Sequence, residues 1–163
     1  MKKRNKKYRP REVRGNALDW AIAGVHTFPV ETQRDIMKVA MNGFNKLREG
    51  IASRDDWNLV CQALNVGEAL CELHIGDNLI DDFHRGHEAL HKIALRMLSG
   101  KSSTCYAHEL AAINEALEMH KIQLQLCTQA EFSRAIVRVT NLINGGAQDS
   151  VAKTYARLNG EIA

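Results

Sequence analysis

The histidines have the clearest potential for chemistry in this sequence, because three of them occur at helical spacing near an acidic side chain. His84 and His87 are three positions apart, and His120 lies within an otherwise apolar stripe. Glu68 lies beside another apolar stripe. Two or three neutral imidazoles with one carboxylate form a set of ligands that zinc accepts. The same groups can also satisfy one another's hydrogen bonds inside a core, and they are then structural.

The elements that must position these side chains are helices. From residue 16 onward apolar residues recur every three or four positions, and no stretch alternates as a strand does. Ser53 with Asp56, and Thr128 with Glu131, form capping boxes that predict helix starts. We predict helices at residues 17–25, 29–49, 53–75, 78–99, 104–127 and 128–144.

This periodicity predicts an all-α fold, and the short loops between the helices predict a single antiparallel bundle of five to six helices. Folding the helices at 53–75 and 78–99 into a hairpin brings Glu68 near His87. The next hairpin brings His84 and His87 to the level of His120, to within a helical turn of ~5 Å. The sequence therefore predicts a polar cluster of Glu68, His84, His87 and His120 inside or beside the bundle.

Four interpretations of this cluster are open. The first, which we favour, is a hydrogen-bonded structural group that needs no cofactor. The second is a site for zinc or another divalent metal. The third is a di-iron site of the ferritin kind, although only Glu88 with His91 supplies the Glu-x-x-His pair that such a site uses twice. The fourth is acid–base catalysis by His87 and Glu68, for which no nucleophile or oxyanion hole is evident nearby.

The four cysteines predict reduced thiols. They are widely spaced, and a chain of 163 residues builds a core without disulfides. Cys71 with His74 and Cys105 with His108 have the spacing of metal ligands, but the two pairs lie at opposite ends of the predicted helix 78–99. They therefore cannot share one ion within a monomer.

The net charge of +3 divides into a basic arm and a mildly acidic body. Residues 1–14 contain eight Lys or Arg and one Glu, whereas the rest contains 14 basic and 18 acidic residues, so the arm carries +7 and the body −4. Its scarcity of apolar side chains predicts a flexible, disordered arm at 1–15, followed by a helical bundle at 16–146 and a weakly helical segment at 147–163. The arm residues that suit phosphate binding, base stacking or an acidic protein partner are Lys2, Lys3, Arg4, Lys6, Lys7, Tyr8, Arg9, Arg11 and Arg14.

Several function classes find no support in the sequence. The chain has no run of about 18–20 apolar residues and no secretory signal, which predicts a soluble cytoplasmic protein that does not contact membranes. The motifs G-x-x-x-x-G-K-[ST], G-x-G-x-x-G, H-E-x-x-H and G-x-S-x-G are missing. We therefore expect a protein that is not an enzyme and that binds another protein, with nucleic-acid binding through the arm as the alternative. Self-association into a homodimer through an apolar helix face is a further option.

A resemblance to a known group of proteins rests on short motifs. They are Lys6-Lys7-Tyr8-Arg9-Pro10-Arg11, Asp55-Asp56-Trp57, Ala63-Leu64-Asn65-Val66 and Ile113-Asn114-Glu115-Ala116-Leu117-Glu118-Met119-His120. With these motifs the chain resembles, over most of its length, small all-helical proteins encoded by bacteriophages and prophages. The resemblance implies a viral accessory or regulatory protein that acts in the cytoplasm of a bacterial host. Such a protein would bind a host or phage macromolecule, for example to inhibit a host process or defence system, and no catalytic residue is carried over.

Overall fold

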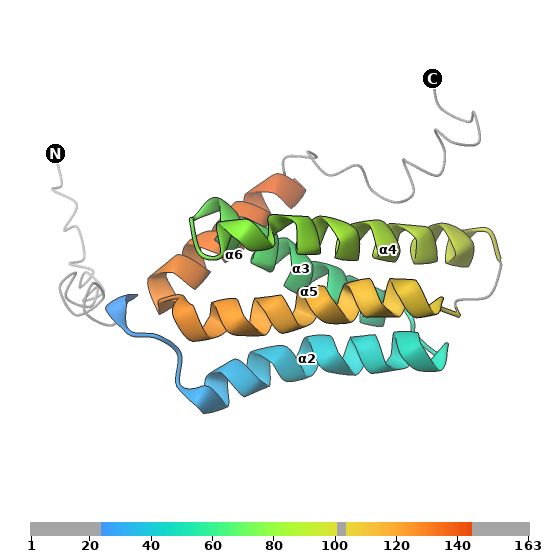
Figure 1. Cartoon of the computed structure of the whole chain (residues 1–163), viewed down its shortest axis with the longest axis horizontal. Helices are drawn as coiled ribbons and strands as arrows, with labels where there is room; N and C mark the ends of the chain where they lie inside the picture. The colour runs from blue at the N-terminus through green and yellow to red at the C-terminus, as the bar shows by residue number, and fades with distance from the viewer. Residues whose placement is uncertain (1–23, 101–103, 145–163) are drawn as a thin grey trace, which may run out of the picture.

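Five α-helices and one short 3-10 helix make up the described part of the protein. The computed structural model describes residues 24–100 and 104–144 (Figure 1). The elements are α2 (Val30–Glu49), α3 (Arg54–Glu72), η1 (Asp77–Leu79), α4 (Ile80–Leu98), α5 (Ala107–Leu126) and α6 (Gln129–Asn144). Within these ranges no strand forms apart from one isolated bridge between Thr27 and Thr128, so the all-α prediction is confirmed. The predicted arm at 1–15, the segment at 147–163 and most of the helix at 17–25 lie outside the described residues.

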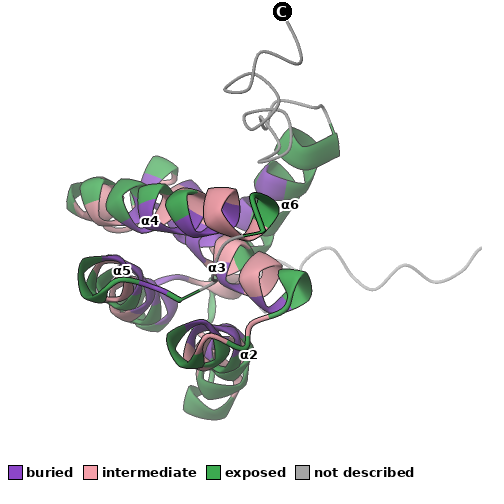
Figure 2. Ribbon diagram, turned by 90° about the vertical axis from the view of Figure 1, so that its right-hand side faces the viewer, coloured by how far each residue is buried: buried purple, intermediate pink, exposed green. Residues whose placement is uncertain are grey.

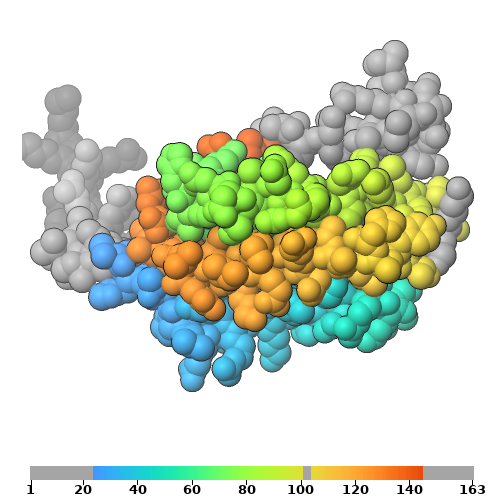
Figure 3. Space-filling view, in the orientation of Figure 1, coloured from blue at the N-terminus to red at the C-terminus, as the bar shows by residue number. Residues whose placement is uncertain are grey.

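Helices α2, α3, α4 and α5 form an antiparallel four-helix bundle, and α6 packs outside it. Consecutive helices run in opposite directions, and α3 packs against each of the other four (Figures 1 and 2). Helix α6 makes its main contact with α3. On the face drawn in Figure 3, the atoms of α4, α5 and α2 form a continuous surface. Four helices therefore surround a common core, and α6 is held mainly from a single side, by α3 (Figure 2).

The helix boundaries follow local sequence signals. Gly50 ends α2 with φ 72, a left-handed conformation that glycine adopts without strain. The capping box of Ser53 and Asp56 is present at the start of α3, since each residue's side chain accepts a hydrogen bond from the other's backbone N–H. The box predicted for Thr128 and Glu131 is present as well, so α6 begins at the expected place.

Three predicted ends need correction. The third helix stops at Glu72, three residues before the predicted end, and the chain then turns through His74, whose φ is 65. The fourth helix begins at Ile80 after the tighter turn η1. The fifth begins at Ala107 rather than at Thr104, because Glu109 accepts a hydrogen bond from the backbone N–H of Tyr106, at 2.8 Å, and so caps the helix two residues later.

Close approach between helices depends on glycine at two places. A Cβ atom on Gly67 of α3 would lie 2.3 Å from Phe83 Cε1 of α4. A Cβ atom on Gly86 of α4 would lie 2.7 Å from Leu64 and 2.9 Å from Ala116 of α5. All three distances are far shorter than a carbon–carbon contact allows. The two glycines thus let α4 pack closely against α3 and α5, which fixes the levels of the histidines on α4.

Candidate functional site

Glu68, His84 and His87 come together between α3 and α4, as the predicted hairpin requires. Glu68 Oε1 lies 3.4 Å from His84 Nε2, and Glu68 Oε2 lies 3.3 Å from His87 Nε2. The two histidines approach different oxygens of the carboxylate, so the three groups do not converge on one point. Among the described residues, no group of three or more His, Cys, Asp or Glu side chains is arranged to hold a metal ion.

The electrostatics of this cluster depend on the charge of the histidines. Proximity to His87, and then to His84, holds the pKa of Glu68 below its ordinary value, although partial burial acts in the opposite direction. His84 is exposed, whereas the Nε2 atom of His87 is buried without a hydrogen bond of acceptable geometry. The contacts are therefore ion pairs when the imidazoles carry a proton and weak polar contacts when they do not.

His120 has a different neighbour from the one that the hairpin geometry predicts. It is 1% exposed, and its Nδ1 atom lies 3.5 Å from Oε1 of Gln123, one turn further along α5. It makes no ion pair with Glu68, so the predicted four-residue cluster is reduced to three residues. The pairing of helices gives the level of a residue along the bundle, but it does not give the direction in which its side chain points.

Gln123 is a buried polar residue that the sequence reasoning missed. Its amide nitrogen donates hydrogen bonds to the carbonyl oxygens of Gly67, at 3.0 Å, and Ile75, at 2.8 Å, and approaches Cys71 Sγ at 3.2 Å. Its side-chain oxygen remains available to accept from His120. Gln123 thus joins α5 to the end of α3. Burial lowers the pKa of its neighbour His120 to about 4, so the imidazole of His120 is neutral at physiological pH.

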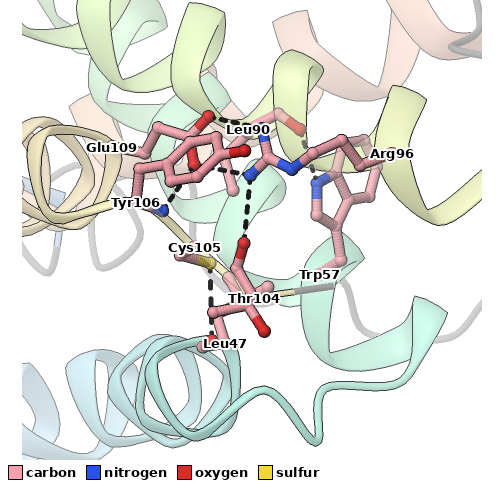
Figure 4. Close-up of polar contacts among 8 residues, drawn as sticks. All are labelled: Leu47, Trp57, Leu90, Arg96, Thr104, Cys105, Tyr106 and Glu109. Carbon is pink, nitrogen blue, oxygen red and sulfur yellow. Dashed lines mark hydrogen bonds and ion pairs between the residues drawn. The ribbon is translucent and has the colours of Figure 1, made fainter. Parts of the chain in front are cut away.

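A second buried group, also missed, joins the ends of α4 and α5. Arg96 donates two hydrogen bonds to Glu109, from Nη1 to Oε1 at 2.7 Å and from Nη2 to Oε2 at 2.5 Å (Figure 4). The Arg96 guanidinium also lies 4.6 Å from the centre of the Tyr106 ring. Burial raises the pKa of Glu109, but the hydrogen bonds from Arg96 and from the Tyr106 N–H outweigh it, and the pKa lies below its ordinary value. Glu109 is therefore an ionised carboxylate held in place by Arg96 and by the Tyr106 N–H, and it links α4 to the start of α5.

Contacts around this ion pair connect it to the other two helices of the bundle. Arg96 Nη2 also donates to the carbonyl oxygen of Thr104, at 3.3 Å. Trp57 of α3 donates from Nε1 to the carbonyl oxygen of Leu90, at 3.0 Å, and Cys105 donates from Sγ to the carbonyl oxygen of Leu47 of α2, at 3.4 Å (Figure 4). Residues of all four helices of the bundle therefore take part in hydrogen bonds near this ion pair (Figure 4).

The cysteines are free thiols, as predicted. Burial raises the pKa of Cys71 and of Cys127 to about 11, and it also raises the pKa values of Cys61 and Cys105. Because the thiolate is the nucleophile and the metal ligand, all four are unreactive thiols at neutral pH.

The surface of α6 has the composition of a contact site. Only Ala135 and Val139 of this helix are buried. Four of its large apolar side chains stay exposed: Ile136 by 41%, Val137 by 58%, Leu142 by 43% and Ile143 by 47%. Figure 2 shows most of α6 in the colour of exposed residues. Helix α3 thus covers the middle of the apolar face of α6 and leaves both flanks open.

The basic residues predicted to contact phosphates or a partner, Lys2 to Arg14, lie outside the described part of the chain. No helix within the described ranges is long and apolar enough to cross a membrane. In comparisons with known proteins, no family model, no curated protein and no solved structure matches this chain.

Proposed function

We propose that this protein is a non-enzymatic accessory protein of the bacteriophage type, and that it binds a macromolecular partner through α6. The supporting observation is the apolar surface of this helix. Ile136 and Ile143 are seven positions apart and therefore lie on one side of α6, where both are more than 40% exposed. Exposed apolar residues that cluster in this way are typical of protein–protein interaction sites.

The chemistry of the buried polar groups agrees with a binding function. Glu109 is held by Arg96, and His120 by Gln123. The Arg96–Glu109 pair joins α4 to α5, and Gln123 joins α5 to the end of α3, so both groups fix the scaffold. The partner would be a protein of the bacterial host or of the phage, for example one whose activity the bound protein inhibits.

Affinity capture from a bacterial lysate tests this function. The full chain would be compared with the double variant Ile136→Asp/Ile143→Asp and with a matched control, Ile122→Asp/Leu126→Asp. The control replaces residues of α5 that are similarly exposed, by 43% and 64%. We expect one protein to be retained by the natural chain and by the α5 control and to be lost from the α6 variant. Loss from both variants, or retention of no protein by the natural chain, would contradict the proposal.

The charge of the N-terminal arm favours nucleic-acid binding as a second candidate function. Eight Lys or Arg within residues 1–14 can displace counterions from several phosphates. We expect binding of duplex DNA or of RNA to weaken steeply as salt is added. On duplex DNA, a plot of the logarithm of the binding constant against the logarithm of the salt concentration should have a slope of about −0.9 for each phosphate contacted. Removing residues 1–14 should then abolish the binding. Equal binding with and without the arm would exclude this candidate.

A further inference from the structure

The flank of α6 opposite the two isoleucines is basic. Arg134, Arg138 and Leu142 follow one another at intervals of four positions and so lie along one stripe of the helix. Together with Val137 and Asn141 they lie on the outer surface of α6, the helix that packs outside the four-helix bundle. We call these five residues the α6 ridge.

The surface next to this ridge is acidic. A depression runs between α3 and α6 and is lined by Asn65, Glu68, Ala69, Glu72, Val139 and Leu142. We call it the α3–α6 groove, and both of its charged residues are glutamates. Leu142 lines the groove as well as the ridge, so the basic and acidic surfaces are contiguous.

The charges of this surface are only partly neutralised within the described chain. Arg138 makes an ion pair with Glu72, but both side chains are about half exposed, which makes the pair a weak one. Among residues 24–100 and 104–144, Arg134 makes no ion pair. The ridge therefore keeps cationic character next to the acidic groove.

A surface of this kind is complementary to itself. In a dimer with two-fold symmetry the same patch is used by both copies, and every contact occurs twice. If the axis runs along the border between the ridge and the groove, the ridge of each copy lies over the groove of the other, with arginines facing glutamates. Leu142, at the border of both surfaces, then lies close to the axis, where the two copies bring their leucines together.

The composition of the surface also suits such an interface. Interfaces between proteins combine an apolar centre with a polar rim. Here Val137 and Leu142, exposed by 58% and 43%, supply apolar area, and charged residues of both signs surround them. A stable interface buries roughly 800 Å² on each partner, so neighbouring residues of α3 and α4 would have to contribute as well.

We propose that the protein forms a symmetric homodimer in which the α6 ridge of each copy docks into the α3–α6 groove of the other. The inference goes beyond the proposed function, because partner binding there uses the isoleucine flank of α6. The two flanks lie on opposite sides of the buried Ala135 and Val139. One dimer therefore offers two copies of the partner-binding flank.

Reciprocal charge reversal tests the homodimer. The molar mass of the full chain, 18.3 kDa as a monomer, would be measured by light scattering during size-exclusion chromatography. The protein would be loaded at about 100 µM, where a dimer with a dissociation constant of about 1 µM is almost fully assembled. The ridge variant is Arg134→Glu/Arg138→Glu, and the groove variant is Glu68→Lys/Glu72→Lys. Lys121→Glu, an exposed reversal on α5, is the matched control, and circular dichroism checks that each variant keeps its helices.

We expect the natural chain and the Lys121→Glu control to have twice the monomer mass. Each reversal variant should dimerise at least about tenfold more weakly, since like charges then face each other. An equimolar mixture of the two variants should recover the dimer, because each reversed ridge again faces a groove of opposite charge. A monomeric natural chain, a dimer that neither reversal weakens, or a mixture that stays monomeric would overturn the proposal. None of these results would alter the outcome of the capture assay with Ile136→Asp/Ile143→Asp.

Discussion

Acidification from pH 7 to pH 5 should destabilise this protein through a single buried imidazole, that of His120. A histidine whose folded-state pKa is lowered is protonated first in the unfolded chain, so the free energy of unfolding falls as the pH falls. For His120 the window extends from the ordinary value of 6.5 down to about 4. Well above pH 6.5 the side chain is neutral in both states and contributes no pH dependence.

The magnitude follows from the two pKa values. At pH 5 the unfolded chain is almost fully protonated at this position and the folded chain only slightly, which corresponds to a loss of about 2 kcal/mol relative to pH 7. The loss continues toward pH 4 and then levels off. A change of this size is a large fraction of the stability of a domain of this length.

Urea denaturation at a series of pH values between 7 and 4 measures the effect. The natural chain would be compared with His120→Asn, whose amide can still donate to Gln123 Oε1 in place of Nδ1. His108→Gln, which removes an exposed histidine from the same helix, is the control. We expect His120→Asn to remove about 2 kcal/mol of the difference between pH 7 and pH 5, and His108→Gln to leave that difference almost unchanged. Equal pH dependence in the natural chain and in His120→Asn would refute the reasoning, whatever the absolute stability of the variant.

Three further predictions concern the scaffold. Arg96→Met should lower the free energy of unfolding, measured in urea, by about 3 kcal/mol, because it leaves the carboxylate of Glu109 buried without its ion-pair partner. A change below about 1 kcal/mol would show that the ion pair is not buried in solution. Gly67→Ala should lower the melting temperature, by an amount that corresponds to a loss of about 1–3 kcal/mol in the free energy of unfolding, since the new methyl group meets the ring of Phe83. An unchanged melting temperature would contradict the close approach of α3 and α4. Glu68→Gln should flatten the decline of stability below pH 4.5, because a carboxylate whose pKa is lowered in the folded state stabilises the fold above its unfolded-state pKa and loses that effect on protonation. Glu68 is about one-third exposed, so the free energy of unfolding should change by less than about 1 kcal/mol. A steeper decline in the variant would contradict the prediction.

The parts of the structure that depend on local sequence were predictable. The capping boxes at Ser53 and Thr128 depend on residues three positions apart, and the end of α2 depends on Gly50, so each can be read within one turn of helix. The contact of Glu68 with His87 was predictable too, because a short loop leaves little freedom in how α3 and α4 pair.

The parts that depend on side-chain direction were not predictable. Arg96 and Glu109 are 13 positions apart on two helices, and their pairing depends on how far each helix is rotated about its own axis. Periodicity gives that rotation only for apolar stripes, and neither residue belongs to one. The start of α5 was missed for the same reason, since the side chain that caps it, Glu109, is also the partner of the arginine.

The hydrogen bonds of Gln123 have a consequence for the order in which the protein folds. The hairpin of α3 and α4 is local in sequence, and by that criterion it should form early. The carbonyl oxygens of Gly67 and Ile75, however, accept hydrogen bonds from a side chain 56 and 48 positions further along the chain. This end of the hairpin therefore reaches its final hydrogen bonding only after α5 has docked.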